Sequence, residues 1–259
     1  MNKTDTRRAF GALFLSAGVL ALAAPLVAVQ AGPLSWLGGE RVQGSGKVVR
    51  QNRQVSNFHG LAVGVSGDVD IRIGNTEGVT IETDDNLQPL VETVVENGTL
   101  RIRPARNNLR LETHNMKIVV QARSLDKLSV GGSGNVNADQ LRGEHLTIDV
   151  GGSGSINVRD LQAESVEIAL GGSGNLRAAG HAERLQVSIG GSGNVQVGQL
   201  AARDAMVSIG GSGQATIAAS KTLNVSVAGS GDVHYYGDPQ VTKSVMGSGT
   251  VRRLGGMPQ

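Results

Sequence analysis

Hydrophobic and polar residues alternate along most of the chain, and the tripeptide Gly-Ser-Gly interrupts the alternation at regular intervals. A period of two is typical of β-strands, and it places the apolar side chains of a segment on one side and its polar side chains on the other. One copy of the pattern comprises residues 146–150 (LTIDV), the glycine segment 151–154 and residues 156–158 (INV). Each copy therefore predicts two short strands joined by a glycine turn.

The Gly-Ser-Gly tripeptides recur with successive spacings of 18 to 20 residues. They begin at Gly132, Gly152, Gly172, Gly191, Gly211, Gly229 and Gly247. A short and even period predicts a solenoid in which each repeat is one coil stacked on the previous one. We therefore predict an all-β fold, a parallel β-helix with coils of about 18–20 residues. We expect the glycines to supply positive φ angles where each coil turns.

The alternation also predicts how the chain is divided. A single β-helix domain covers residues 57–254, with irregular coils before the Gly-Ser-Gly repeats. In the irregular part, Asn97-Gly98 is typical of a hairpin or tight turn. The predicted segments are 1–31 (export signal or membrane anchor), 32–56 (linker), 57–124 (irregular coils), 125–254 (repeats) and 255–259 (tail).

Residues 1–31 have the pattern of an export signal: basic residues, an apolar stretch over 9–29, and small residues at Val29 and Ala31. Arg7-Arg8 leaves both Sec and twin-arginine export open. The apolar stretch is also about as long as the roughly 20 residues that span a bilayer, so an uncleaved anchor is the alternative. We expect an exported bacterial protein, in the periplasm or at the cell surface, whose membrane contact runs only through this segment.

The charge balance argues against one class of partner. The chain has 24 basic and 22 acidic residues, and beyond residue 31 the counts are equal at 21 each. Nucleic-acid binding requires a basic stripe, so we expect no nucleic-acid partner. The chain has no cysteine, which excludes disulfides and thiolate metal sites. We expect no cofactor.

Several segments together resemble a known family. They are residues 57–61 (NFHGL), 97–102 (NGTLRI), the serial Gly-Ser-Gly turns and residues 231–239 (GDVHYYGDP). Over about residues 57–252 the chain resembles the bacterial head GIN domain family, described as putative autotransporter adhesins. The resemblance implies a right-handed β-helix at the cell envelope and a role in adhesion, with no characterised activity.

A carbohydrate-active β-helix enzyme is an alternative function, and it would need clustered carboxylates. Asp149 and Glu167 could approach each other across adjacent coils, but we interpret them as solvated surface. His181 occupies the position that Leu141 and Leu161 hold in neighbouring coils, and we interpret it as a structural histidine. We therefore predict no catalytic residue and no metal site.

The residue after each Gly-Ser-Gly is polar in all seven repeats. These residues are Asn135, Ser155, Asn175, Asn194, Gln214, Asp232 and Thr250. Our first interpretation is structural, because stacked amides can hydrogen-bond along the axis of a stack. The alternative is a polar array that binds a polymer. The alternation turns Tyr235 inward and Tyr236 outward, where the second ring could stack on a sugar.

We predict a non-enzymatic binding or adhesion module of the cell envelope, with a passive structural spacer as a further alternative. The expected partner is an envelope glycan or a surface protein, and open strand edges would allow homo-oligomers by edge pairing. The candidate binding residues are Asn135, Asn175, Asn194, Gln214, Asp232 and Tyr236.

Overall fold

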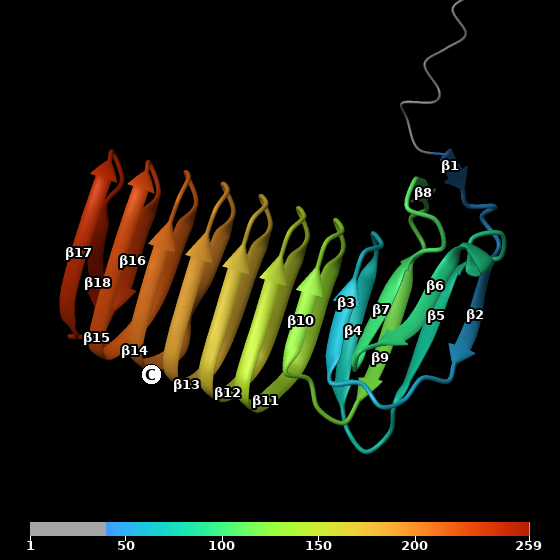
Figure 1. Cartoon of the computed structure of the whole chain (residues 1–259), viewed down its shortest axis with the longest axis horizontal. Helices are drawn as coiled ribbons and strands as arrows, with labels where there is room; N and C mark the ends of the chain where they lie inside the picture. The colour runs from blue at the N-terminus through green and yellow to red at the C-terminus, as the bar shows by residue number, and fades with distance from the viewer. Residues whose placement is uncertain (1–39, 259) are drawn as a thin grey trace, which may run out of the picture. The chain divides into compact units, whose positions relative to one another are not determined.

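The computed structural model describes residues 40–258, which form a stack of β-coils (Figure 1). Strands of successive coils pair in parallel and in register; Asn135 lies opposite Ser155, and Ser155 lies opposite Asn175. The predicted β-helix is thus confirmed. The predicted signal or anchor over 1–31 lies outside the described residues. No helix in residues 40–258 is long and apolar enough to cross a membrane.

Five long strands each bend once, so that one strand crosses both faces of the stack. They are β11 (Asn135–Val150), β12 (Ser155–Leu170), β13 (Asn175–Ile189), β14 (Asn194–Ile209) and β15 (Gln214–Gly229). A Gly-Ser-Gly corner joins each of these strands to the next, and the corners form a row along the upper rim in Figure 1.

The two faces have different strand orders, and we name them by their place relative to the corners. The first face contains the strand halves that follow the corners, and the second face contains the halves that precede them. The first face runs through β2 (Val48–Arg53), β5 (Gly78–Asp84), β9 (Lys117–Ala122), β4 (Asp68–Ile73), β11 to β15, β16 (Asp232–Tyr236) and β18 (Val251–Gly255). The second face runs through β6 (Val91–Glu96), β7 (Thr99–Pro104), β3 (Gly60–Val63), β10 (Lys127–Val130), β11 to β15 and β17 (Gln240–Gly247).

The apolar residues of both faces fill the space between them. Val136 of the first face and Ile148 of the second are each 1% exposed, and their counterparts in the next coils are also buried. Burial of aliphatic side chains stabilises the folded state by roughly 25 cal/mol per Å² of apolar surface removed from water. A lone coil could not bury its apolar side chains, so this core exists only because the coils stack.

The corner glycines are required by close contact between coils. A Cβ atom at Gly172 would lie 2.1 Å from the carbonyl oxygen of Gly152 in the preceding coil, whereas one at Gly171 would meet nothing within 4 Å. Among the corner tripeptides only Gly229 and Gly247 have positive φ, at 138° and 133°. The predicted need for positive φ is therefore wrong for most corners. The missing side chain lets successive corners stack backbone on backbone.

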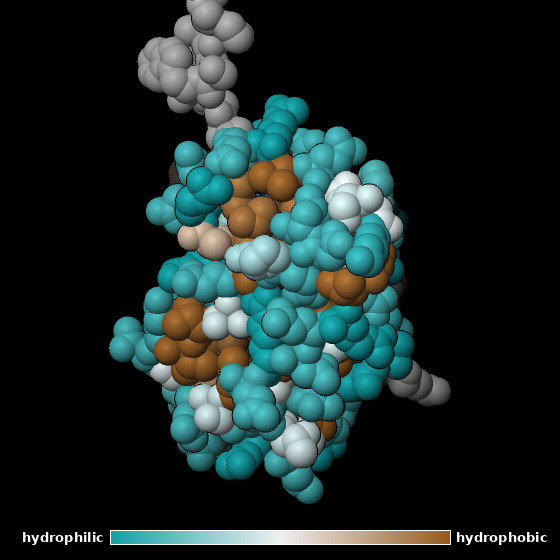
Figure 2. All heavy atoms as spheres, turned by 90° about the vertical axis from the view of Figure 1, so that its right-hand side faces the viewer, coloured by the Kyte–Doolittle hydropathy of each residue, from teal (hydrophilic) through white to brown (hydrophobic). Residues whose placement is uncertain are grey.

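Antiparallel strands close the N-terminal end of the stack. β6 and β7 form a hairpin whose turn has φ angles of 50° at Asn97 and 72° at Gly98, as the sequence predicts. β2 pairs antiparallel with β5, and Arg53 at its end donates to the Gln88 carbonyl in the short 3-10 helix η1 (Gln88–Leu90) at 2.8 Å. Figure 2 looks onto this end and shows a mainly hydrophilic surface with separate hydrophobic patches.

The linker predicted over residues 32–56 is wrong for its described part. β1 (Glu40–Gln43) pairs in parallel with β8 (Leu109–Glu112), and β2 belongs to the first face. The turn between β1 and β2 is also ordered, because the Gly46 N–H donates to the buried Asp84 carboxylate at 2.7 Å. These partners lie far along the chain, which is why the local pattern did not predict them.

The C-terminal end is built differently, since parallel strands continue to the last coil. Val225 and Tyr235 point towards the core, and the residues paired with them in the last coil are Lys243 and Arg253. Charged residues at inward positions are one means by which proteins prevent other chains from pairing with an open sheet edge. The predicted tail continues from β18, whose last residue, Gly255, accepts a hydrogen bond from the Gly237 N–H at 2.9 Å.

One coil is a residue shorter than its neighbour, and this changes the position of His181. The register between β12 and β13 shifts after Val158, so that Leu161 pairs with Gly180 and Gln162 pairs with His181. The prediction that His181 takes the position of Leu161 is therefore wrong. Gly180 takes that position, with φ of 133°, and His181 is exposed.

Candidate functional site

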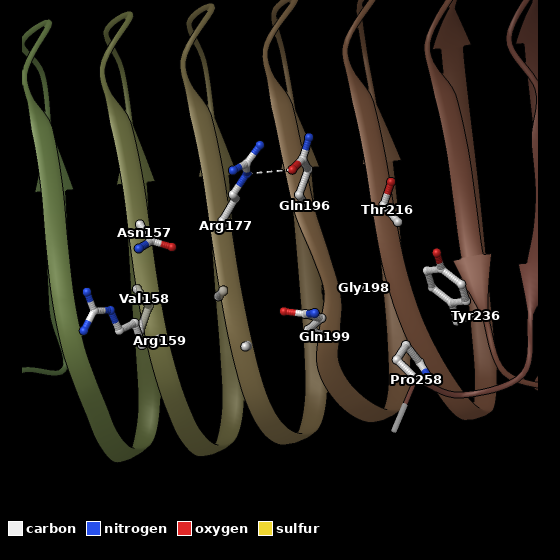
Figure 3. Close-up of a pocket in the computed structure, with 12 residues that line it drawn as sticks. Asn157, Val158, Arg159, Arg177, Gln196, Gly198, Gln199, Thr216, Tyr236 and Pro258 are labelled. Atoms are coloured by element: carbon white, nitrogen blue, oxygen red, sulfur yellow. Dashed lines mark hydrogen bonds between the residues drawn. The ribbon is translucent and has the colours of Figure 1, made fainter.

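A groove crosses the coils on the first face, parallel to the axis of the stack (Figure 3). Its largest part, about 650 Å³, extends from Asn157 on β12 to Tyr236 on β16. A second part, of about 610 Å³, lies beside it on the side of the corners, over the same strands β12 to β14. A third part, of about 460 Å³, extends from β12 to Asp68 on β4. Asn157 lines all three parts, so they adjoin one another, and we call them together the groove.

The strand pairing explains how residues so far apart in sequence line one groove. Outward side chains two residues apart in one strand form two parallel rows across the coils, about 4.8 Å apart from coil to coil. The first row follows the corners: Asp68, Asn135, Ser155, Asn175, Asn194, Gln214 and Asp232. The second row lies two residues later: Asp70, Asn137, Asn157, Arg177, Gln196, Thr216 and His234.

Arg177 and Gln196 form the polar centre of the groove. The Arg177 Nε donates a hydrogen bond of 2.7 Å to the Gln196 Oε1, and this bond orients the guanidinium. Arg159, farther along the groove, forms an ion pair of 3.2 Å with Asp139. Within residues 40–258, no carboxylate oxygen lies within 4.0 Å of the Arg177 guanidinium. The terminal nitrogens of Arg177 thus remain available to a ligand.

An irregularity in the stack hollows out the C-terminal part of the groove. The register between β14 and β15 shifts from Val197 to Ala201, so residues 198–200 bulge from the ladder. A Cβ atom at Gly198 would lie 3.1 Å from the Tyr236 ring. The bulge and the missing side chain together leave room for this ring, and Pro258 lines the same part. Bulges are over-represented beside functional sites.

The opposite end of the groove is acidic. Asp68 and Asp70 of β4 line it together with Lys117 of β9, whose ammonium lies 3.7 Å from the Asp70 carboxylate. Asn135 donates from its Nδ2 to the Asp68 Oδ1 at 3.0 Å. Carboxylates and their partners thus gather at this end, while the arginines lie further along the groove.

The structure brings together four of the six candidate binding residues. Asn175 and Asn194 line the middle of the groove, Asn135 lines its acidic end, and Tyr236 lines its C-terminal part. The Tyr236 ring faces outward and the Tyr235 ring packs against the core, as the alternation predicts. Gln214 and Asp232 share the first row but do not line the groove.

The structural interpretation predicts side-chain hydrogen bonds from coil to coil along the first row, and in the described part of the chain such bonds occur only at its two ends. Among residues 40–258, side chains of this row bond to the corresponding residue of a neighbouring coil at Asn135–Asp68 and between Asp232 and Thr250, which follows the last corner. Gln214 contacts His234 instead, with 3.3 Å between Nε2 and Nδ1. The hydrogen bonds from the Thr250 hydroxyl and N–H lower the pKa of Asp232. The predicted amide ladder is therefore absent from the middle of the row.

The second row was not predicted as part of a site. Asn157, Arg177 and Gln196 lie two residues after the first-row members of their coils, so the same alternation already turned them outward. The repeat template could have identified this row. It could not have identified Gly198 or Pro258, whose places depend on the bulge and on the course of the chain after β18.

The carboxylates considered for catalysis are not directly opposite each other on their paired strands. Asp149 pairs with Ala169 and accepts from the Ser129 hydroxyl at 3.1 Å, while Glu167 pairs with Thr147. Residues 40–258 contain no group of three or more His, Asp or Glu side chains that could hold a metal ion. Both residues lie on the second face, away from the groove.

Comparison with known proteins gives both a family and a fold. A family model described as "Putative auto-transporter adhesin, head GIN domain" matches residues 57–239. The crystal structure of a putative adhesin from Bacteroides fragilis is similar, with a TM-score of 0.77, 24% identity, and coverage of 82% of this chain and 100% of that one.

Two structures from Parabacteroides share the same architecture. A putative lipid binding protein from Parabacteroides distasonis has a TM-score of 0.66 and 25% identity, covering 83% of this chain and 100% of that one. A putative adhesin from Parabacteroides merdae has a TM-score of 0.65 and 21% identity, with the same coverage. No protein of curated function matches the chain.

Proposed function

Because the chain belongs to the family of putative auto-transporter adhesins with a head GIN domain, we propose that it is a non-enzymatic binding module of the bacterial cell envelope. We propose further that an extended envelope glycan is its ligand and lies in the groove of the first face. Export to the periplasm or the cell surface is part of this proposal, and the signal pattern of residues 1–31 supports it.

The observation that carries the proposal is a group of three amides in the middle of the groove. Asn175 and Asn194 of the first row and Asn157 of the second row project from three successive coils, and no hydrogen bond links them to one another. An amide both donates and accepts, as sugar hydroxyls do, so this group can bond to a polymer at each of the three coils. The ring of Tyr236 adds an apolar surface at one end, where a sugar can stack.

A lipid is the second candidate ligand, and it is suggested by the printed name of the Parabacteroides distasonis structure. Hydrocarbon chains require an apolar cavity. The core between the faces is packed with aliphatic side chains, which leave no cavity for a hydrocarbon chain among the pockets of the described residues. The groove is open, and although Ala178, Ala179 and Pro258 line its largest part, amides and Arg177 line most of the part beside the corners. These observations favour the glycan over the lipid.

The test uses the full-length chain and polysaccharide extracted from bacterial envelopes, with matched variants on the two faces. Asn157→Ala combined with Asn194→Ala removes two groove amides. Gln186→Ala combined with Asn224→Ala removes two exposed amides from the second face. Since each lost hydrogen bond costs about 1 kcal/mol, we expect the groove pair to weaken binding roughly tenfold or more.

The control pair should leave binding within about twofold of the wild type. Equal binding by the wild type and the groove pair would contradict the proposed site. Binding of phosphatidylcholine vesicles that the groove pair abolishes, without polysaccharide binding, would favour the lipid. Cleavage of the polysaccharide into shorter products would contradict the non-enzymatic role.

A further inference from the structure

Basic and acidic side chains of the first face lie in different parts of the groove. From Asn157 to Tyr236 the lining of the groove includes Arg159 and Arg177 and no carboxylate, and Asp160, the residue after Arg159, forms an ion pair of 3.4 Å with Arg142. The chain beyond residue 31 has equal numbers of basic and acidic residues, so this local cationic surface is not a consequence of overall composition. A cationic, amide-lined groove with low local negative charge favours an anionic ligand.

Arg177 is the better placed of the two arginines. Its bond to Gln196 fixes the guanidinium plane, whereas the charge of Arg159 is already offset by Asp139 at 3.2 Å. Figure 3 shows the Arg177 guanidinium pointing towards Gln196 of the neighbouring strand, with the dashed line marking their hydrogen bond. A planar guanidinium held in this way presents paired N–H donors that match the two oxygens of a carboxylate.

The aromatic content of the groove distinguishes between anionic polymers. Single-stranded nucleic acid is bound by series of aromatic rings on which successive bases stack, together with several cations along the backbone. The groove offers one ring, Tyr236, three strands away from Arg177, and amides between them. At about 4.8 Å per strand this distance is about 14 Å, which several sugar units would span.

We propose that the groove takes an acidic polysaccharide, with a sugar carboxylate bound by Arg177 and another sugar ring stacked on Tyr236. This inference rests on the proposed function, because it names the chemical class of the ligand in the same groove. The carboxylate pairs with the guanidinium, the intervening hydroxyls bond to the amides, and the acidic end near Asp68 and Asp70 sets one limit to the cationic stretch.

The experiment measures binding of three probes to the full-length chain: polygalacturonate, its methyl ester, and neutral dextran. The wild type should bind polygalacturonate at least about tenfold more tightly than either uncharged polymer, since hydrogen bonds to charged groups are the stronger ones. Arg177→Gln should remove most of this preference. Arg177→Lys should restore only part of it, because lysine keeps the charge and loses the paired donors.

Arg184→Gln is the matched control, since Arg184 is an exposed arginine on the other half of β13. It should leave binding of polygalacturonate within about twofold of the wild type. Equal losses in Arg177→Gln and Arg184→Gln would overturn the inference, because they would indicate attraction by charge alone. Circular dichroism checks that each variant is folded.

Two further outcomes separate this inference from the proposed function. Equal binding of polygalacturonate and its methyl ester would overturn the inference that the ligand is acidic. The proposed function would still stand in that case if Asn157→Ala combined with Asn194→Ala weakened binding of envelope polysaccharide. Tighter binding of single-stranded DNA than of polygalacturonate would also overturn the inferred acidic polysaccharide. Loss of the acidic preference in Arg177→Gln alone supports it.

Discussion

The two faces of the regular coils share one core and differ on their outer surfaces. On the second face the outward residue just before each corner is small in most coils, as in Ser188, Ser208 and Ser226. On the first face the corresponding rows carry Asn, Gln and Arg, and the bulge at residues 198–200 adds a hollow. The same strand alternation thus builds a core on its inner positions, while the outer positions of the first face line the groove.

The largest effect is expected where the corners join the two faces. Gly172→Ala places a Cβ atom against the Gly152 carbonyl oxygen, so the coils must separate locally. Overpacking of this kind costs about 1–3 kcal/mol and at times more, and we expect a loss of at least about 2 kcal/mol. Chemical denaturation of the full-length chain measures this loss as a decrease in the free energy of unfolding.

Gly171→Ala is the control, because a side chain there has open space. It should change the free energy of unfolding by less than about 0.5 kcal/mol. Equal destabilisation by the two variants would show that turn geometry, and not contact between coils, explains the glycines.

An intermediate effect is expected where the shared core ends. Lys243 takes the inward position that Val225 holds one coil earlier, and Val241 and Val245 flank it on β17. Lys243→Val therefore completes an apolar edge, and the predicted pairing of two chains by their edges should become stronger. We expect sedimentation velocity to show association at concentrations where the wild type is monomeric. Unchanged sedimentation would contradict the role of this lysine.

The smallest effect concerns the end of the first row. The folded-state pKa of Asp232 is lowered by the bonds from Thr250, so the stabilisation is present above the unfolded value of about 3.9 and is lost as pH falls through the folded value. Asp232→Asn should remove this part of the acid sensitivity. Because the pair is solvent-screened, we expect a shift in Tm of no more than about 2 °C. Identical pH profiles of Tm for the wild type and Asp232→Asn below pH 5 would contradict this prediction.

The inner and outer positions of the repeats were predictable from sequence, because a strand period of two is a local property. The outward turn of Tyr236 and the inward turn of Tyr235 follow from it directly. The linker error has the opposite origin, since residues 48–53 become a strand only through pairing with β5, some thirty residues later. A local pattern carries no information on such a partner.

The site was predictable only in part, for a related physical reason. Asn175 and Asn194 could be placed in one row because their coils keep register. His181 was misplaced because one residue is missing from its coil, and the spacing of the corners does not say where the register shifts. The hollow at Gly198 arises from such a shift as well, so it became visible only in the structure.

The proposed ligand lies on the first face, and the absence of native cysteine allows its position to be measured directly. Gln199→Cys places one thiol in the groove, and Gln186→Cys places one on the second face. The rate of labelling by a maleimide dye is then measured with and without envelope polysaccharide. We predict that the polysaccharide slows labelling in the groove and leaves the second face unchanged. Equal protection at both positions, or protection of the second face alone, would contradict this position of the ligand.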